Sequence, residues 1–340
     1  MAYHVYVTVS GEGRIARYSM DGATAALTHA GDHAAAGRPA PVAITPDRRF
    51  MYVARRDDLL ISSYAIDPAS GALSELGSIP TETDPCHMST DRSGRWLLSA
   101  HYLGETAAVH RIGEDGCAQQ PAVEWRHTGR GAHCFQTDPS NRFAFVPHIE
   151  GNGGLNAILQ FRFDAASGRL APNAPPAVKP AGLDGPRHYC FHPSRDVVYV
   201  SNEQGCSVSV YDFGREAGTL ALRQTISTLP NDWRGKNTCA QINITPDGRY
   251  LYAPNRGHDS LAEFAVDADD GGLTALGRAP AEATPRAFAI DPTGRFLLSA
   301  GLDSGRLATY RIDQASGHLE RIATTEVGKA PMWVTILPAS

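Results

Sequence analysis

The sequence lacks the features that mark membrane-spanning and nucleic-acid-binding proteins. No stretch approaches the roughly 18 consecutive apolar residues that a membrane-spanning helix requires. The formal net charge is -5 and there is no basic run, so we expect neither a nucleic-acid partner nor a membrane partner. The first residues contain no basic segment followed by an apolar one, which predicts a cytoplasmic protein.

Cysteine is scarce, and the six cysteines form no C-x-x-C pair. This spacing excludes the usual structural zinc sites, and we interpret the cysteines as small buried thiols in a reducing compartment. The sequence also contains neither an H-E-x-x-H segment nor a G-x-S-x-G elbow. We therefore expect no metal, no cofactor and no serine-based acyl-enzyme.

A turn phrase of the form Asp-Pro-x-Gly-Arg-aromatic, with small variations, is repeated along the whole chain. Its copies occupy residues 45–50, 91–96, 138–143, 192–197, 245–250 and 291–296, at intervals of 46 to 54 residues. Proline, aspartate and glycine in this order favour type I or type II turns. Each phrase is preceded by one strand-like segment and followed by an apolar strand, an alternating strand, a second turn and a short strand.

Four antiparallel strands in a unit of about 40–50 residues are typical of a β-propeller blade. The segment 330–336 matches the first strand of the other units, and the segments 3–9, 14–18 and 26–29 would supply its missing outer strands. We therefore predict an all-β protein, a seven-bladed β-propeller with four-stranded antiparallel blades. Residues 1–340 would form a single domain, closed by one blade that the N-terminal and C-terminal strands share.

Polar side chains concentrate at one end of the predicted inner strands. Counting back from each turn phrase places five residues at the start of an inner strand, near one mouth of the channel: His87, His133, Arg187, His188 and Arg286. The strand that follows each turn returns to the same mouth and contributes five more: Tyr102, Asn202, Glu203, Asn255 and Arg256. The blades repeat but these residues do not, so we predict a single asymmetric pocket.

A purely structural role is the alternative for each of these residues. An arginine at a blade end can pair with a neighbouring carboxylate, and a channel histidine can simply bond to a carbonyl group. The aspartates of the turn phrases recur too regularly to belong to a site, and we interpret them as turn formers. Glu203 differs from them, because no other unit has a carboxylate at the equivalent position.

Several segments resemble the seven-bladed lactonase propellers, a family that includes bacterial 6-phosphogluconolactonases and fungal carboxymuconate cyclases. They are residues 185–193, 201–203, 244–249, 255–260, 285–288 and 328–334, and the resemblance extends from about residue 5 to residue 336. It implicates His133, Arg187, Glu203 and Arg256 as catalytic residues. We expect the substrate to contact the remaining residues of the mouth: His87, Tyr102, His188, Asn202, Asn255 and Arg286.

Lactone hydrolysis needs an attacking water, a base for its proton and a donor that stabilises the oxyanion. Glu203 is the candidate base, and His133 or His188 would share the proton transfer. Arg187 and either Arg256 or Arg286 would hold the oxyanion and the anionic group of the substrate. We expect a metal-independent, monomeric lactonase that opens a small sugar lactone, 6-phospho-D-glucono-1,5-lactone, in the pentose phosphate pathway of carbohydrate metabolism.

Other functions remain compatible with the sequence. An aldarolactone or uronolactone would present a carboxylate to the same arginines, and cycloisomerisation of a carboxymuconate uses similar groups in the reverse sense. A non-catalytic propeller that binds a partner across its face is the alternative from another class. Such scaffolds usually expose an aromatic and apolar rim, whereas this sequence concentrates charge at the channel mouth.

Overall fold

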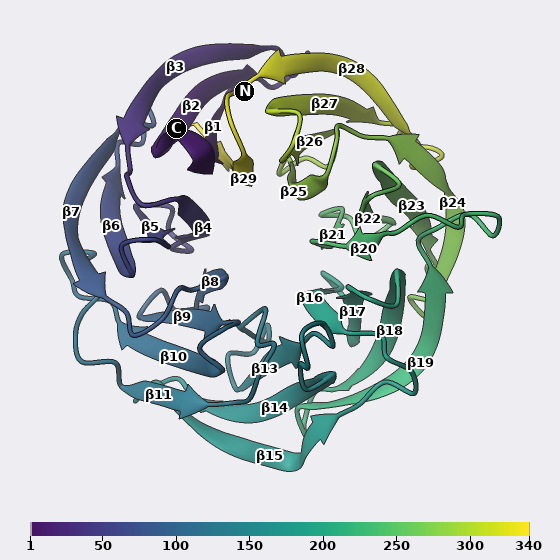
Figure 1. Ribbon diagram of the computed structural model, residues 1–340, viewed down its shortest axis with the longest axis horizontal. Helices are drawn as coiled ribbons and strands as arrows, with labels where there is room; N and C mark the ends of the chain where they lie inside the picture. Colours follow the sequence, from purple (N-terminus) through teal and green to yellow (C-terminus); the bar gives the residue numbers. More distant parts are fainter. Residues whose placement is uncertain (1, 340) are drawn as a thin grey trace. The chain divides into compact units, whose positions relative to one another are not determined.

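The computed structural model describes residues 2–339 and consists of antiparallel β-strands with one short 3-10 helix, η1 (Ser10–Glu12). The strands form seven antiparallel sheets, and Figure 1 labels most of the strands. Six sheets have four strands, and the seventh has five because β20 and β21 both pair with β22. This confirms the predicted seven four-stranded blades. The chain divides into two compact units, so the single domain over residues 1–340 stays a prediction.

The first unit comprises residues 2–33, 187–213 and 220–339 and holds four of the sheets. Their strands are β29 (Pro331–Pro338), β1 (Ala2–Val9), β2 (Arg14–Asp21) and β3 (Leu27–Ala34); β16 (Pro186–Phe191), β17 (Val197–Asn202), β18 (Ser207–Gly214) and β19 (Thr219–Ser227); β20 (Thr238–Cys239), β21 (Asn243–Ile244), β22 (Tyr250–Arg256), β23 (Ser260–Val266) and β24 (Leu273–Pro280); and β25 (Pro285–Ile290), β26 (Phe296–Gly301), β27 (Arg306–Ile312) and β28 (Leu319–Glu326).

The second unit comprises residues 34–186 and 214–219 and holds the other three sheets. Their strands are β4 (Pro39–Ile44), β5 (Phe50–Arg55), β6 (Leu60–Ile66) and β7 (Leu73–Pro80); β8 (His87–Thr90), β9 (Trp96–His101), β10 (Thr106–Arg111) and β11 (Glu124–His127); and β12 (Gln136–Thr137), β13 (Phe143–His148), β14 (Ala157–Asp164) and β15 (Arg169–Val178).

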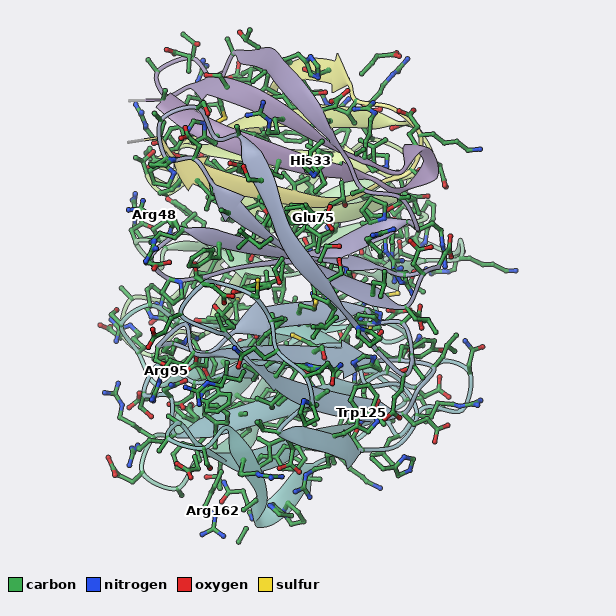
Figure 2. All side chains as sticks on the ribbon, turned by 90° about the vertical axis from the view of Figure 1, so that its left-hand side faces the viewer. His33, Arg48, Glu75, Arg95, Trp125 and Arg162 are labelled. Atoms are coloured by element: carbon green, nitrogen blue, oxygen red, sulfur yellow. The ribbon has the colours of Figure 1, made fainter. Side chains whose placement is uncertain are left out.

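The aspartate of the turn phrase stabilises the turn through hydrogen bonds to the backbone, which explains why the phrase is repeated. The carboxylate of Asp91 accepts hydrogen bonds from the backbone N–H groups of Ser93, Arg95 and Trp96 at 2.8–3.1 Å. The following arginine, Arg95, has an exposed side chain beside this turn (Figure 2). Asp138 makes the same three contacts in its own turn. These carboxylates are therefore turn formers, as the sequence predicted.

The two chain ends share one sheet of the first unit. Strand β1 pairs with β2 on one side and with β29 on the other, in a register that places Val5 opposite Ile336. Because β1 is hydrogen-bonded along both edges, the N-terminal strand is held as an interior strand of its sheet. The predicted blade shared by both termini is confirmed.

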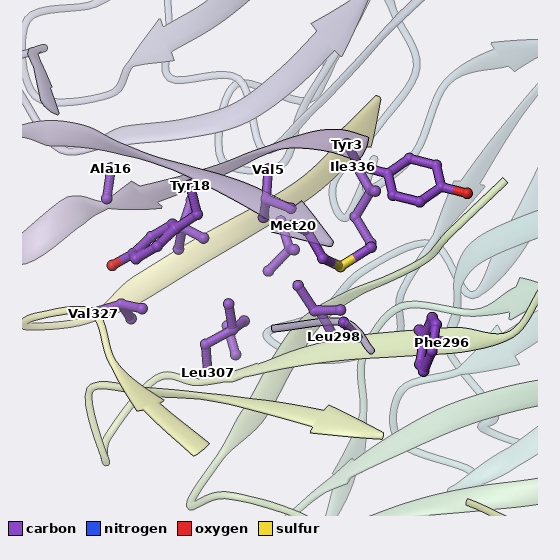
Figure 3. Packing of buried hydrophobic residues seen from close by; sticks show 14 of the residues in the cluster. Tyr3, Val5, Ala16, Tyr18, Met20, Phe296, Leu298, Leu307, Val327 and Ile336 are labelled. Atoms are coloured by element: carbon purple, nitrogen blue, oxygen red, sulfur yellow. The ribbon is translucent and has the colours of Figure 1, made fainter. Parts of the chain in front are cut away.

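The same sheet packs its apolar face against the sheet of β25–β28. Val5 and Leu298 are 0% exposed and lie in one cluster with Met20, Phe296 and Ile336, as Figure 3 shows. Alternating apolar residues on each strand place their side chains on this shared face. Burial of such side chains stabilises the unit by roughly 1.5–3 kcal/mol for each fully buried aliphatic residue.

Buried histidines are a feature of the second unit. His101 and His148 are 0% exposed, and each accepts or donates hydrogen bonds through at least one ring nitrogen. His110 is also 0% exposed, and neither of its ring nitrogens has a hydrogen-bond partner in the described part of the chain. His101 and His110 both contact the ring of Trp125 on β11, which is labelled in Figure 2. Burial lowers the pKa of all three histidines to about 4.

Candidate active site

Glu203 and two arginines form a buried ion-pair cluster in the first unit. Nε of Arg187 donates to Oε2 of Glu203 at 2.5 Å, and Nη2 of Arg256 lies 3.1 Å from the same oxygen. The side chain of Arg187 is 2% exposed, that of Glu203 is 14% exposed and that of Arg256 is 11% exposed. The structure therefore brings together three of the four residues predicted to be catalytic.

The positions of these side chains follow from the strands. Arg187 is the second residue of β16, Glu203 follows the last residue of its neighbour β17, and Arg256 ends β22. The backbone N–H of Cys239 on β20 donates to the carbonyl oxygen of Glu203 at 3.0 Å. Nη2 of Arg256 donates to the carbonyl oxygen of Cys239 at 2.6 Å. Strand β20 thus connects the end of β17 to the end of β22 behind the cluster.

The charges of the arginines decide the ionisation of Glu203. Burial raises the pKa of its carboxyl group. This effect is outweighed by the hydrogen bond from Arg187 and by the positive charges of Arg187, Arg256 and Arg286. The pKa of Glu203 is therefore lowered below its ordinary value. Glu203 is therefore an ionised carboxylate at neutral pH. Three guanidinium groups around one carboxylate leave a surplus of positive charge, which favours binding of an anion.

Asn202 and Asn255 directly precede Glu203 and Arg256 in the sequence. Both are 0% exposed. The Asn202 amide donates to Ser207 and Ser209, and the Asn255 amide donates to the carbonyl oxygen of Thr228 and to Ser260. Their amide donors are thus engaged by protein groups, and contact of the two asparagines with the substrate stays a prediction. They stabilise the strand ends that carry Glu203 and Arg256.

His188 and Arg286 are the other predicted residues of the first unit. The ring of His188 lies 6.4 Å from that of Trp333, measured between centroids. Successive side chains of a strand point to opposite faces, so His188 faces away from its neighbour Arg187. Arg286, on β25, is half-buried and near enough to lower the pKa of Glu203. Substrate contact by Arg286 and the proton-transfer role of His188 both stay predictions.

The remaining predicted residues belong to the second unit. His133 is buried, with its ring centroid 6.0 Å from that of Tyr102, and its backbone N–H donates to the carbonyl oxygen of Pro147. The hydroxyl of Tyr102 donates to the carbonyl oxygen of Gly151 at 3.3 Å. The rings of Tyr102 and His133 thus lie close together, and the catalytic role of His133 beside Glu203 stays a prediction.

His87 lines a cavity of about 410 Å³ within the second unit. Nδ1 of His87 accepts a hydrogen bond from the backbone N–H of Phe135 at 3.3 Å. Strands β4, β8 and β12 supply the wall of this cavity, which includes Ser89, Thr90 and Gln136. The contact of His87 with substrate stays a prediction, and its hydrogen bond with Phe135 is the structural alternative that the sequence left open.

Two cysteines beside the cluster were not predicted from the sequence. Cys206 lies in the turn that begins at Glu203, and Cys239 contributes the backbone contacts described above. Cys134 and Cys239 are buried, whereas Cys86, Cys117, Cys190 and Cys206 are half-exposed, so the expectation that all six thiols are buried was wrong. No repeat signal identifies the two cysteines, because Cys206 lies in the turn between β17 and β18 whereas Cys239 lies on β20 of another sheet.

The described residues offer neither a metal-binding cluster nor a membrane-spanning helix. Among residues 2–339, no three histidine, cysteine, aspartate or glutamate side chains lie close enough together to hold a metal ion. Within the same residues, no helix has the length and apolar character needed to cross a membrane.

The sequence matches known lactonases over most of its length. Residues 4–336 match the profile of the family described as "Lactonase, 7-bladed beta-propeller". A 6-phosphogluconolactonase of Serratia proteamaculans is 40% identical over 303 residues, which cover 89% of each chain. A 6-phosphogluconolactonase of Pectobacterium carotovorum is 36% identical over 301 residues, 88% of this chain and 89% of the relative.

Solved structures agree with this similarity. A periplasmic gluconolactonase of Pseudomonas aeruginosa superposes with a TM-score of 0.90 at 27% identity and full coverage of both chains. A putative 6-phosphogluconolactonase of Bacteroides fragilis has a TM-score of 0.89 at 26% identity, covering 99% of this chain and 98% of the other. The arrangement of strands is therefore shared across substantial sequence divergence.

Proposed function

This chain belongs to the lactonase family of seven-bladed β-propellers, and we propose that it hydrolyses 6-phospho-D-glucono-1,5-lactone to 6-phosphogluconate. The observation that carries this proposal is the carboxylate of Glu203 held between Arg187 and Arg256. It combines an ionised carboxylate with a surplus of positive charge at one place. The names of the relatives at 36–40% identity support the phosphorylated lactone as the substrate.

The arginines suit both charges of this substrate. The phosphate group is anionic throughout the reaction, and the lactone carbonyl oxygen becomes anionic when water adds to the ring. Guanidinium groups bind such oxygens through paired N–H donors. We assign the half-buried Arg286 to the phosphate group and the more deeply held Arg256 to the developing oxyanion, because stabilisation of an oxyanion is strongest where water is excluded.

Glu203 acts mainly by orienting the attacking water. The ion pairs that Arg187 and Arg256 make with Glu203 both involve Oε2, so we assign Oε1 to accept a hydrogen bond from the water. A carboxylate with a lowered pKa is a weak base at neutral pH, and general-base catalysis alone contributes typically about 10²–10⁴-fold. The lactone ester is already activated by its ring, so orientation together with electrostatic stabilisation accounts for the larger part of the acceleration.

The direct test is the hydrolysis of freshly generated 6-phospho-D-glucono-1,5-lactone by the purified protein. We expect a rate proportional to enzyme concentration and well above the spontaneous rate, with little activity towards unphosphorylated D-glucono-1,5-lactone. A rate equal to the spontaneous one would overturn the proposal. Equal kcat/KM for the two lactones would overturn the assignment of Arg286 to a phosphate group and leave lactone hydrolysis standing.

The cellular setting remains a prediction from the sequence. We place the reaction in the cytoplasm and in the pentose phosphate pathway, because the proposed substrate is a phosphorylated sugar lactone. A monomer is expected, and size-exclusion chromatography with light scattering tests that expectation directly.

A further inference from the structure

Two cysteines lie beside the ion-pair cluster. Cys206 lies three residues after Glu203, and Cys239 is paired with Asn255 in the register of β20 and β22. Sγ of Cys206 contacts Asn237, Sγ of Cys239 contacts Asn255, and these two asparagines hydrogen-bond each other. Cys239 is 0% exposed, whereas Cys206 is half-exposed. One thiol of the pair is therefore accessible to a small reagent, and its partner is enclosed.

A polar network holds the two sulfur atoms in place. Sγ of Cys206 lies 3.3 Å from Nδ2 of Asn237, and this nitrogen donates to Oδ1 of Asn255 at 3.0 Å. Sγ of Cys239 lies 3.3 Å from the hydroxyl of Thr228 and 3.7 Å from the same Oδ1 of Asn255. The two sulfur atoms are thus restrained by neighbouring groups that are themselves hydrogen-bonded to each other, which reduces the conformational freedom lost when they react.

The surroundings also favour ionisation of the accessible thiol. The neighbouring Cys239 side chain is the largest influence that lowers the pKa of Cys206, to about 6, and the amide of Asn237 and the charge of Arg256 act in the same direction. The thiolate is the nucleophilic form of cysteine. By contrast, burial and the carboxylate of Asp115 raise the pKa of Cys117. Cys206 is therefore the better nucleophile of these two half-exposed cysteines.

We propose that Cys206 and Cys239 form a reversible oxidation site that responds to hydroperoxides. The Cys206 thiolate attacks the terminal oxygen of the hydroperoxide, and the O–O bond breaks. The oxygen that leaves takes up one proton. The products are the Cys206 sulfenic acid and an alcohol, or water when the oxidant is hydrogen peroxide. The Cys239 thiol then attacks the Cys206 sulfur and displaces water, which leaves the disulfide. The two thiols lose two electrons and the peroxide gains them. A dithiol reductant reverses the change by thiol–disulfide exchange.

The disulfide would act on the lactonase site through the backbone of Cys239. Its N–H donates to the carbonyl oxygen of Glu203, and its carbonyl oxygen accepts from Arg256. Disulfide geometry is narrowly defined, so closing the S–S bond shifts these two contacts from their reduced positions. Misplacement of catalytic groups by about 1 Å costs on the order of a hundredfold in rate. This part of the inference rests on the proposed function, and we expect the oxidised protein to be the less active form.

Peptide mapping of the full chain tests the covalent step without any assay of activity. The protein is treated with hydrogen peroxide, alkylated and digested with trypsin, which places Cys206 in peptide 196–215 and Cys239 in peptide 237–249. We expect these two peptides to be joined after oxidation and separate after treatment with dithiothreitol. Recovery of both peptides with free thiols, of Cys206 as an over-oxidised acid, or of Cys206 linked to another cysteine would overturn the proposal.

Activity towards the phosphorylated lactone supplies the second measurement. We expect the kcat/KM of the peroxide-treated protein to fall by roughly a hundredfold and to recover with dithiothreitol. Cys239→Ala should abolish both the cross-link and the loss of activity that dithiothreitol reverses. If the variant with the buried Cys239→Ala substitution does not fold, Cys206→Ser provides a second test of the same two effects. Cys117→Ser is the matched control and should respond as the unaltered protein does.

The two measurements separate the two hypotheses. A cross-link in a protein without lactonase activity would overturn the proposed function and leave the oxidation site standing. A lactonase that forms the cross-link without any change in rate would overturn the coupling between the thiol pair and the cluster.

Discussion

Arg187 and Glu203 form an ion pair that is almost fully removed from solvent, with Nε 2.5 Å from Oε2 and the arginine side chain 2% exposed. Arg256 approaches the same carboxylate oxygen at 3.1 Å. Burying charged groups has a high desolvation cost, which only close geometry and additional hydrogen bonds offset. The stability of the protein therefore depends on all three side chains of the cluster. Removal of one of them leaves a buried charge whose desolvation cost is no longer offset.

Replacement of Arg187 tests this dependence. We expect Arg187→Met to lower the free energy of unfolding by roughly 3–5 kcal/mol, because a buried pair loses one partner. Chemical denaturation measures the change. Arg311→Met is the control, since its pair with Glu320 has side chains 53% and 66% exposed and such a pair contributes about 0–1 kcal/mol. Equal losses in both variants would contradict a special role for the buried pair.

Glu203→Gln tests the chemical role of the carboxylate. The amide keeps the shape of the side chain but neither bears a charge nor accepts a proton, so we expect kcat/KM to fall by roughly 10²–10³-fold, the range seen when one stabilising group is lost from an active site. Circular dichroism and thermal unfolding should show that the variant is folded. Glu263→Gln, a buried carboxylate of the same unit that contacts His318, is the control and should retain activity. An active Glu203→Gln variant would exclude Glu203 from the mechanism.

The pH dependence of activity tests the charge balance at Glu203. Arg256 lowers the pKa of Glu203 against the opposing influence of burial. In Arg256→Gln the pKa should therefore rise, and the carboxylate should be lost at a higher pH than in the unaltered protein. We expect the acid limb of the kcat/KM profile to move towards neutral pH. Arg249→Gln, which removes an exposed ion pair with Asp247, should leave this limb unchanged.

The buried histidines of the second unit predict sensitivity to acid. Burial lowers the pKa of His110 to about 4 in the folded protein, against about 6.5 in an unfolded chain. The unfolded state therefore binds protons first, so stability is fully present above about pH 6.5 and decreases as the pH falls towards 4. The difference amounts to on the order of 3 kcal/mol for one histidine.

His110→Phe keeps a ring beside Trp125 and removes the group that titrates. We expect its free energy of unfolding to decline less between pH 6.5 and 4 than that of the unaltered protein. His127→Phe is the control, because the side chain of His127 is 73% exposed. An unchanged pH dependence in His110→Phe would show that His110 does not contribute to acid denaturation.

The shared terminal sheet predicts that the C-terminal strand is essential for stability. Ile336 lies in the cluster with Val5 and Leu298 (Figure 3), and Ile336→Ala should lower the free energy of unfolding by about 2–5 kcal/mol through the cavity that it creates. Leu183→Ala is the control, since Leu183 is 71% exposed and surface changes usually stay within about 0.5 kcal/mol. A comparable effect of the two substitutions would contradict the proposed packing.

The blades and the positions of the main charged residues could be predicted from the sequence because they depend on local rules. Aspartates of the turn phrases bond to backbone groups only two to five residues away, as Asp91 does with Ser93 and Trp96. The alternation of apolar residues then determines which side of a strand is buried. Equivalent positions in the repeat therefore identified Arg187, Glu203 and Arg256 without any coordinates.

Only the tertiary structure decided what the side chains at these positions contact. Asn202 and Asn255 occupy strand ends as predicted, yet their amides face buried hydroxyl and carbonyl groups. The bond between Asn237 and Asn255 beside the two cysteines, and the sharing of one Glu203 oxygen by two arginines, depend on how neighbouring sheets pack. A repeat period determines where each strand begins, but the direction and partner of a side chain depend on packing between sheets, which no local pattern encodes.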